Sequence, residues 1–335
     1  MPIGADAGVE VERELEAHRR ALTGYCYRML GSGSEAEDAV QETMVRAWKA
    51  ADKLQEKAAL KAWLYRIASN VCFDMLQGPQ RRATPMDMGP ASPASASLGE
   101  PLGELAWVQP IADAKIAPEG GDPAEVAASR ETLRLAFVAA LQHLPPKQRA
   151  VLILREVLRW QATEVAELLD TTVASVNSAL QRARATLETL DLDATTTAAG
   201  DIDDAEQRDL LQRYVAAFEA YDMSELVKLL QRDAAFSMPP FPLWLVGQDD
   251  IVTFMQTTGA KCEGSKVIPT WANGGPAFAI YNPMDDGSFE GWAVVVMETS
   301  GGKVSALHHY IFPELFAQFG LPRGLDQAED AVQPA

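Results

Sequence analysis

The chain has 335 residues, of which 47% are hydrophobic, and a formal net charge of −18. This length and composition predict two or three folded domains and exclude wholesale disorder. Three single cysteines without metal-ligand spacing exclude a disulfide framework and a metal site. No apolar run approaches the roughly 20 residues of a membrane span, and the acidic N-terminus lacks the layout of a secretion signal. We therefore expect a cytoplasmic protein that does not contact a membrane.

The charge is unevenly distributed along the chain. Residues 12 to 82 contain 12 basic and 10 acidic residues, whereas residues 201 to 335 contain 8 basic and 20 acidic ones. Nucleic-acid binding depends on the charge of the binding face and not on that of the whole chain. The acidic balance therefore does not exclude a DNA-binding N-terminal half.

Two amphipathic helices are predicted before residue 50. Residues 12–30 show apolar residues at helical spacing, and the run Gly31 to Ser34 ends the pattern. Ser34 is suited to cap a second helix, residues 35–48. Its predicted buried stripe consists of Val40, Met44, Ala47 and Trp48. Four polar residues lie largely off that stripe, Glu35, Asp38, Gln41 and Glu42. A solvated surface is the usual interpretation of such a face, so by itself it indicates no partner.

A third helix is predicted over residues 61–77, because Gly78 and Pro79 stop its apolar pattern. Polar residues off the apolar stripe and the arginine pair that follows are Arg66, Asn70, Asp74, Gln77, Arg81 and Arg82. Tyr65 and Phe73 are suited either to core packing or to stacking on nucleic-acid bases.

The run DAVQETMVRAW, followed by AWLYRIASNVCFDML and an arginine pair, resembles the second domain of bacterial sigma factors of the extracytoplasmic-function (ECF) group. The resemblance covers residues 12–82. It implies that the polar face of residues 35–48 binds the clamp helices of the RNA polymerase beta-prime subunit. It also implies that the 61–77 helix and the arginine pair bind and open the minus-ten promoter element.

The chemistry of the 61–77 helix agrees with that role. An unstacked base needs hydrogen bonds and stacking in its new surroundings. Asn70 offers both a donor and an acceptor to a base edge, and Arg66, Arg81 and Arg82 can neutralise phosphates.

Residues 83–122 are rich in proline, alanine, serine and glycine and have few periodic apolar residues. This composition predicts a flexible linker with extended proline segments.

A helix-turn-helix is predicted within residues 123–190. Its first helix covers residues 163–169, the turn residues 170–172, and the second helix residues 173–190. A recognition helix reads bases from its N-terminal end. The candidate residues are Thr172, Ser175, Asn177, Ser178, Gln181, Arg182 and Arg184.

The segment 123–190 resembles the fourth domain of ECF sigma factors. That resemblance implies binding to the minus-thirty-five element and to the beta flap of the polymerase. ECF factors often have a glycine in the turn, where this chain has Asp170 and Thr171, and that is a modest departure.

A second linker, residues 191–204, precedes a domain over residues 205–320 and a tail over residues 321–335. Helices are followed by strands, which predicts an α+β cone with a curved antiparallel sheet. This order resembles the SnoaL-like members of the NTF2-like superfamily. The fold class is thus multidomain: two all-α sigma domains, the second a helix-turn-helix, and an α+β NTF2-like cone.

The candidate ligand pocket of the third domain consists of Trp244, Tyr281, Trp292 and His308. Adjacent histidines on a strand point to opposite faces, so at most one of His308 and His309 faces a pocket. No acid–base pair at helpful spacing is visible. We therefore expect a regulatory or ligand-sensing domain without catalytic role or cofactor.

Two functions remain in contention at this level. The first is an ECF-type sigma factor that binds core RNA polymerase and promoter DNA, with an NTF2-like domain that modulates activity and takes a small-molecule ligand. The second is a one-component helix-turn-helix regulator with a small-molecule-sensing domain. A ketosteroid-isomerase-type enzyme fused to a DNA-binding domain is disfavoured by the missing acid–base pair.

Overall fold

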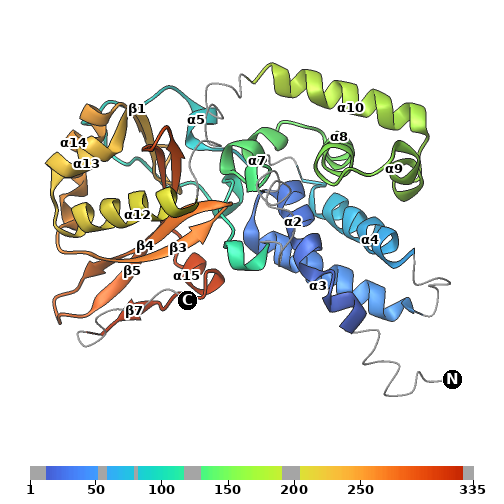
Figure 1. Cartoon of the computed structure of the whole chain (residues 1–335), viewed down its shortest axis with the longest axis horizontal. Coiled ribbons are helices and arrows are strands. Elements are labelled where there is room, and N and C mark those ends of the chain that lie inside the picture. Colours follow the sequence, from blue (N-terminus) through green and yellow to red (C-terminus); the bar gives the residue numbers. More distant parts are fainter. Residues whose placement is uncertain (1–12, 52–58, 79–81, 117–129, 191–203, 327–335) are drawn as a thin grey trace. The chain divides into compact units, whose positions relative to one another are not determined.

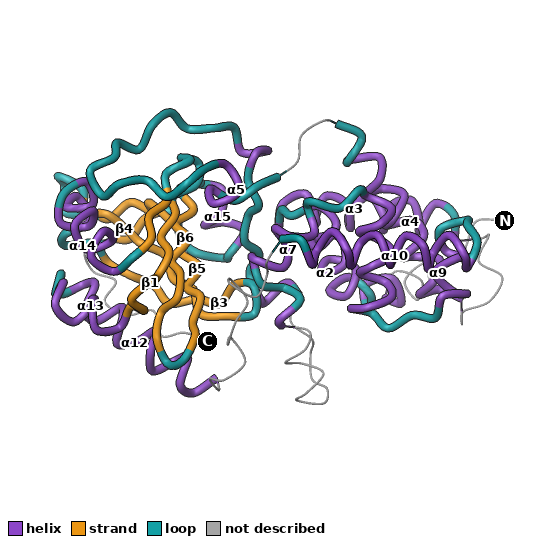
Figure 2. Tube along the Cα trace, turned by 90° about the horizontal axis from the view of Figure 1, so that it is seen from above, coloured by secondary structure: helices purple, strands orange, loops and turns teal. Residues whose placement is uncertain are grey.

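The computed structural model describes residues 13–51, 59–78, 82–116, 130–190 and 204–326. The chain separates into two compact units. The first consists of residues 1–81 and 114–195, and the second of residues 82–113 and 196–335. Figure 2 shows the strands confined to the second unit, whereas the regular structure described in the first is helical.

The first unit contains two groups of helices (Figure 1). The first group is α2 (Arg19–Leu30), α3 (Gly33–Lys49) and α4 (Leu60–Met75). The second group is α7 (Leu135–Leu141), α8 (Pro146–Leu152), the π-helical turn η5 (Ile153–Val157), α9 (Ala162–Leu168) and α10 (Val173–Glu188). The 3-10 turn η4 (Asp113–Lys115) lies at the boundary between the two units. The helices predicted over residues 35–48, 61–77 and 173–190 are confirmed.

The junction between α2 and α3 differs from the prediction in one residue. Gly31 takes a left-handed conformation at φ 72° and donates its N–H to Tyr27 O, which ends α2. Ser32, and not Ser34, is the N-cap of α3, since its hydroxyl accepts from Glu35 N at 3.4 Å. Ser34 lies inside the helix, with its hydroxyl 3.0 Å from that of Ser32.

Buried cations join the two helix groups into one unit. Arg28 of α2 is 4% exposed and donates Nε to Thr132 O at 3.1 Å. Burial lowers its pKa to about 10, so the guanidinium remains charged at neutral pH. Arg149 of α8 is equally buried and donates to Met29 O and to Gln142 Oε1. Because such charges are costly to bury, their backbone acceptors specify how the two groups pack.

The helix-turn-helix has the predicted order. Thr172 caps α10 by accepting from Ser175 N at 3.1 Å. Asp170 in the turn has φ 50°, the conformation for which glycine is the usual residue. The buried side of α10 consists of Val176, Ala179, Leu180 and Ala183. The recognition helix is therefore anchored on one side and exposed on the other.

The second unit is an α+β cone. Its helices are α5 (Pro85–Met88), α12 (Asp204–Glu219), α13 (Met223–Leu229), α14 (Gln248–Gln256) and α15 (Glu314–Gln318), with the 3-10 turns η3 (Glu104–Ala106) and η6 (Thr258–Cys262). Its strands are β1 (Leu230–Ser237), β2 (Trp244–Val246), β3 (Lys266–Ala272), β4 (Gly275–Pro283), β5 (Phe289–Ser300), β6 (Lys303–Tyr310) and β7 (Gly324–Leu325).

The sheet order is β2-β1-β6-β5-β4-β3, and β7 pairs with β5. The predicted antiparallel sheet is thus corrected in one place, because β1 pairs with β6 in parallel. The predicted tail is also corrected: its residues 324 and 325 form β7, so the domain extends beyond residue 320. One face of the sheet packs against α12, α13 and α14 around a core that includes Tyr214, Phe236, Phe254 and Phe278 (Figure 1).

Residues 82–113 belong to the cone unit, which corrects the predicted flexible linker over this range. Ile111 N donates to Asn273 Oδ1 and Asn273 N to Ile111 O, both at 3.1 Å. Trp107 and Val108 are buried, at 0% and 1% exposed. Figure 1 shows the segment in cyan alongside the cone. Residues 117–122 of the first predicted linker and residues 191–203 of the linker predicted over 191–204 lie outside the described residues.

Candidate nucleic-acid interface

The polar face predicted on α3 is exposed. Asp38, Gln41 and Glu42 all point to solvent, and Glu35 is half-buried in the first turn. The opposite face buries Ala36, Ala39, Val40, Thr43 and Ala47. Because successive buried positions are three or four residues apart, the two faces separate along the whole helix.

Trp48 was predicted to be buried, and that prediction is wrong. Its side chain is 61% exposed, and Met44 is only half-buried. The buried stripe of α3 continues through Ala47, and the next residue lies about 100° further round the helix. Trp48 and the 38% exposed Val45 therefore extend the face of Asp38 and Gln41. This face, residues 38, 41, 42, 45 and 48, is called the α3 face below.

Four of the residues predicted to contact the minus-ten element form one exposed row, three on α4 and the fourth two residues past its end at Met75. They are Arg66, Asn70, Asp74 and Gln77. Spacings of four, four and three residues place them in one row. Tyr65, in contrast, is 1% exposed, with its ring centroid 5.2 Å from that of Tyr25, so it belongs to the core and is not available for stacking. Phe73 is half-buried.

Of the two arginines that follow α4 in the sequence, Arg82 does not extend this exposed row. Arg82 is only 7% exposed, and its Nη1 donates to Trp107 O at 2.8 Å and to Glu104 O at 3.3 Å. The predicted phosphate contact of Arg82 is therefore corrected, because its guanidinium holds the 82–113 segment together. Arg81 lies outside the described residues.

Arg66 contacts the helix-turn-helix within the first unit. Its guanidinium donates to Leu168 O at 3.2 Å and also to Glu167 O, at the carboxyl end of α9. The ring centroids of Tyr65 and Trp160 lie 5.2 Å apart, and Lys61 Nζ lies 5.6 Å from the Trp160 ring centroid. These contacts between α4 and residues 160–168 are called the α4–α9 contact below. The α4–α9 contact therefore engages Arg66, for which a DNA phosphate is the predicted partner.

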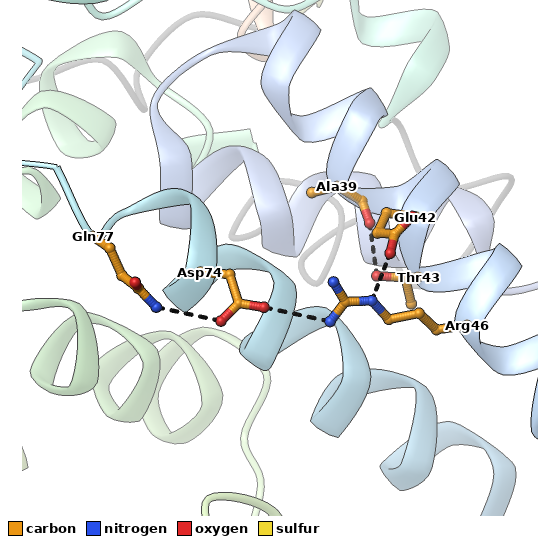
Figure 3. Close-up of polar contacts among 6 residues, drawn as sticks. All are labelled: Ala39, Glu42, Thr43, Arg46, Asp74 and Gln77. Atoms are coloured by element: carbon orange, nitrogen blue, oxygen red, sulfur yellow. Dashed lines mark hydrogen bonds and ion pairs between the residues drawn. The ribbon is translucent and has the colours of Figure 1, made fainter.

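A polar network joins the α3 face to the row on α4 (Figure 3). Arg46 Nε donates to Glu42 Oε1 at 2.6 Å, and Arg46 Nη1 donates to Asp74 Oδ2 at 3.4 Å. Gln77 Nε2 donates to Asp74 Oδ1 at 3.4 Å. The hydrogen bond that Arg46 donates to Glu42 is the main cause that raises the pKa of Arg46 above its usual value. Arg46 was not singled out from the sequence, although its i,i+4 spacing from Glu42 is a signal for this pair.

The candidate base-reading residues of α10 are all exposed: Thr172, Ser175, Asn177, Ser178, Gln181, Arg182 and Arg184. Three of them also make other contacts. The Ser175 hydroxyl lies 2.9 Å from that of Thr172. Thr172 caps the helix, and Arg184 Nη2 donates to Glu156 Oε1 at 2.6 Å. Short polar side chains thus occupy the N-terminal half of an exposed helix face, where direct reading of base edges takes place in helix-turn-helix proteins.

The four residues of the candidate ligand pocket do not converge, which corrects that prediction. His308 Nδ1 and Ser237 Oγ share a hydrogen bond of 2.8 Å. Ser237 pairs with both His308 and Trp244 across neighbouring strands, so these side chains lie on the same face of the sheet. Trp292 packs against the core on the opposite face. Tyr281 donates to Pro322 O at 2.9 Å and packs against Phe316.

His309 is the histidine that faces the helices, with its ring centroid 4.4 Å from that of Phe236. The two adjacent histidines therefore point to opposite faces, as predicted. Burial, followed by the neighbouring His308, lowers the pKa of His309 to about 3. Its Nδ1 has no hydrogen-bond partner among the described residues. His308, on the other face of the sheet, has the carboxylate oxygen Glu298 Oε1 3.7 Å from its Nε2.

Two properties of the described ranges concern metal ions and membranes. No group of three or more His, Cys, Asp or Glu side chains there is arranged to hold a metal ion. In the same residues, no helix is both long and apolar enough to cross a membrane.

Three family models match the chain in the order in which its domains occur. Residues 15–82 match sigma-70 region 2, residues 134–187 match sigma-70 region 4, and residues 206–289 match the nuclear transport factor 2 (NTF2) domain. The first match contains α3 and α4, and the second contains the helix-turn-helix.

Individual relatives agree with these matches. The ECF RNA polymerase sigma factor SigG of Mycobacterium tuberculosis is 43% identical over 313 residues, which is 92% of this chain and 83% of that protein. SigJ of the same organism is 28% identical over 249 residues, 72% of this chain and 71% of that protein. The crystal structure of SigJ shares the fold, with a TM-score of 0.63 at 23% identity, covering 92% of this chain and 99% of that chain. The chain therefore belongs to the extracytoplasmic-function RNA polymerase sigma factors and carries an NTF2-like domain behind its two sigma domains.

Proposed function

We propose that this sigma factor divides its work among three helices. The α3 face binds the clamp helices of the polymerase beta-prime subunit, the row on α4 binds the minus-ten element, and the N-terminal half of α10 reads the minus-thirty-five element. The second helix group also binds the beta flap. Its place of action is the cytoplasm, with core polymerase and promoter DNA as partners.

One observation supports this division most directly. The residues assigned to polymerase and to the minus-ten element lie on two different exposed faces of adjacent helices, α3 and α4. A sigma factor must contact polymerase and DNA at the same time, so its two binding faces have to be separate but rigidly connected. Helices packed on a common core, here including Tyr25, Tyr65 and Val40, meet that requirement.

The α3 face also has the composition of a docking site. Trp48 and Val45 add exposed apolar area to the carboxylates of Asp38 and Glu42. Large aromatic side chains supply much of the binding energy at protein interfaces, and charged neighbours direct the encounter. We therefore assign a basic surface with an apolar recess as the complementary site on the polymerase.

Run-off transcription with purified core polymerase and a promoter library tests the proposal. We expect specific transcripts from the wild type and none from Asp38→Arg or Glu42→Arg, because each reversal places a like charge against a basic partner. Asp250→Arg in α14 is a matched control, since Asp250 is an equally exposed carboxylate outside the α3 face. Full activity of both α3 variants would contradict the assignment.

For the NTF2-like domain we propose a modulating role without catalysis. A modulating role is supported by the 82–113 segment, which belongs to the same unit as the cone and directly follows the first sigma domain in the chain. A small-molecule ligand of this domain would contact the inner sheet face near His309 and Trp292, and Trp292 is the one predicted pocket residue that this site keeps.

A one-component regulator is the alternative that the family assignment disfavours. Such a regulator would use the helix-turn-helix alone and would need no match to sigma-70 region 2 over residues 15–82. Binding of duplex DNA without polymerase distinguishes it from a sigma factor. Specific, tight binding of the isolated chain to a promoter duplex would favour the regulator.

A further inference from the structure

Arg46 lies between two carboxylates that belong to different proposed interfaces (Figure 3). Its Nε bonds to Glu42 on the α3 face at 2.6 Å, and its Nη1 bonds to Asp74 on the α4 row at 3.4 Å. All three side chains are accessible, with exposed fractions of 42% for Arg46, 48% for Glu42 and 58% for Asp74. The Arg46 guanidinium thus forms ion pairs with two exposed carboxylates, those of Glu42 and Asp74.

Asp74 is the unusual member of the α4 row. Arg66 and Asn70 suit a nucleic-acid partner, whereas an unpaired carboxylate repels the phosphates of a DNA strand. A carboxylate is useful at a base edge only as an acceptor, for the exocyclic amino group of cytosine or adenine. Both considerations require a nearby cation that neutralises Asp74 without covering all of its acceptor sites.

Arg46 meets this requirement. It takes Asp74 Oδ2, and Gln77 Nε2 donates to the other oxygen, Oδ1. Each carboxylate oxygen has two lone pairs, so Asp74 keeps acceptor capacity on its exposed side. The two donors contact different oxygens of Asp74, each at 3.4 Å, so together they restrict the rotation of its carboxylate more than one donor would.

We propose that Arg46 is a positioning residue for recognition of the minus-ten element: it neutralises and orients Asp74, which together with Gln77 accepts from the exocyclic amino group of an unstacked adenine or cytosine. The inference rests on the proposed function, in which α4 contacts that element. At the ring position of that amino group, thymine and guanine carry the carbonyl oxygens O4 and O6, which the carboxylate rejects; the N2 amino group of guanine lies on its other edge.

The test uses holoenzyme assembled from the full-length chain and core polymerase. The probe is a single-stranded oligonucleotide with the minus-ten element of a promoter selected by run-off transcription, with each base replaced in turn. Four proteins are compared with wild type: Arg46→Ala, Asp74→Asn, the double variant, and Lys49→Ala. Lys49 is a matched control, an exposed cation on the same helix. Affinity for core polymerase is measured in parallel, because Arg46 also contacts Glu42.

We expect Arg46→Ala to weaken oligonucleotide binding about fivefold, and to have an effect of less than about twofold when Asp74→Asn is already present. Exposed ion pairs commonly account for changes of this size. At one position of the element, the preference for adenine or cytosine over thymine or guanine should disappear in both single variants. Lys49→Ala should leave affinity and preference unchanged.

Two results would overturn the inference while leaving the proposed function intact. One is an effect of Arg46→Ala no larger than that of Lys49→Ala. The other is an equal effect with and without Asp74→Asn, accompanied by a salt dependence reduced by about one phosphate contact, which would make Arg46 a direct phosphate ligand. Failure of the wild-type chain to form holoenzyme would instead refute the proposed function.

Discussion

The variant Trp48→Ala tests whether Trp48 is a docking residue or a core residue. In the free protein, 61% of the Trp48 side chain is exposed. Truncation therefore removes little packing, and we expect the free energy of unfolding to change by less than about 0.5 kcal/mol, as for other surface substitutions. A buried tryptophan would instead cost about 3–5 kcal/mol.

The expected effect on binding follows from the exposed area. A tryptophan side chain buries up to about 250 Å², so the exposed 61% corresponds to roughly 150 Å². At about 25 cal/mol per Å², complete burial against polymerase is worth up to ~4 kcal/mol. The cost of ordering and imperfect desolvation reduces this to about 2–3 kcal/mol, a loss of 30- to 150-fold in affinity.

Fluorescence anisotropy of labelled protein titrated with core polymerase measures this loss, and urea unfolding measures stability. Met284→Ala is the control, because Met284 is a 45% exposed apolar residue of the cone unit. Unchanged affinity for Trp48→Ala would remove Trp48 from the docking surface. A drop in stability of several kcal/mol would show that its exposure had been misjudged.

Three further outcomes follow from the structure. Arg159 has φ 59°, so Arg159→Gly should raise the free energy of unfolding by about 0.5–1 kcal/mol in urea titrations, because glycine adopts this conformation without strain. His309 is neutral in the folded state with a pKa of about 3 and binds protons near pH 6.5 when unfolded, so stability is complete above pH 6.5 and falls as the pH drops toward 3. The loss at pH 5 is about 2 kcal/mol, and melting curves of His309→Leu should not show it. Truncation after residue 203 should cause aggregation in light-scattering assays, since it removes the partners of the buried Ile111 and Ala112, which pair with residues 272 and 273.

Helical faces were predictable because their periodicity is local. The row Arg66, Asn70, Asp74 and Gln77 and the exposed side of α10 follow from the 3.6-residue repeat alone. Trp48 was misplaced because Ala47 and Trp48 are neighbours, and periodicity over one turn does not decide which of two adjacent residues is buried. The fact that Ala36, Ala39 and Thr43 are buried resolves the choice, but small residues carry a weak hydrophobic signal.

Contacts between distant segments were not predictable in this way. Ile111 bonds to Asn273, a separation of 162 residues, and nothing in the proline- and alanine-rich composition of residues 83–122 indicates that partner. The same contacts bury Arg82, whose position beside α4 in the sequence suggested DNA. The candidate pocket residues of the cone were chosen as aromatic and histidine side chains, and they did not converge because the sheet face of each is set by strand pairing and by the register shift between Ile280 and Tyr281.

The α4–α9 contact has a geometric consequence for the proposed function. Elements centred near positions −10 and −35 are separated by about 25 base pairs, roughly 85 Å of B-form DNA at about 3.4 Å per base pair. In the structure, Tyr65 of α4 and Trp160 before α9 are in ring contact at 5.2 Å, and α10, with 16 residues, is about 24 Å long. A recognition helix of that length, attached to α9, does not span the remaining distance. Simultaneous binding of α4 and α10 to one promoter therefore requires the α4–α9 contact to open, and opening also releases Arg66 from the carbonyl groups of Glu167 and Leu168 for contact with DNA.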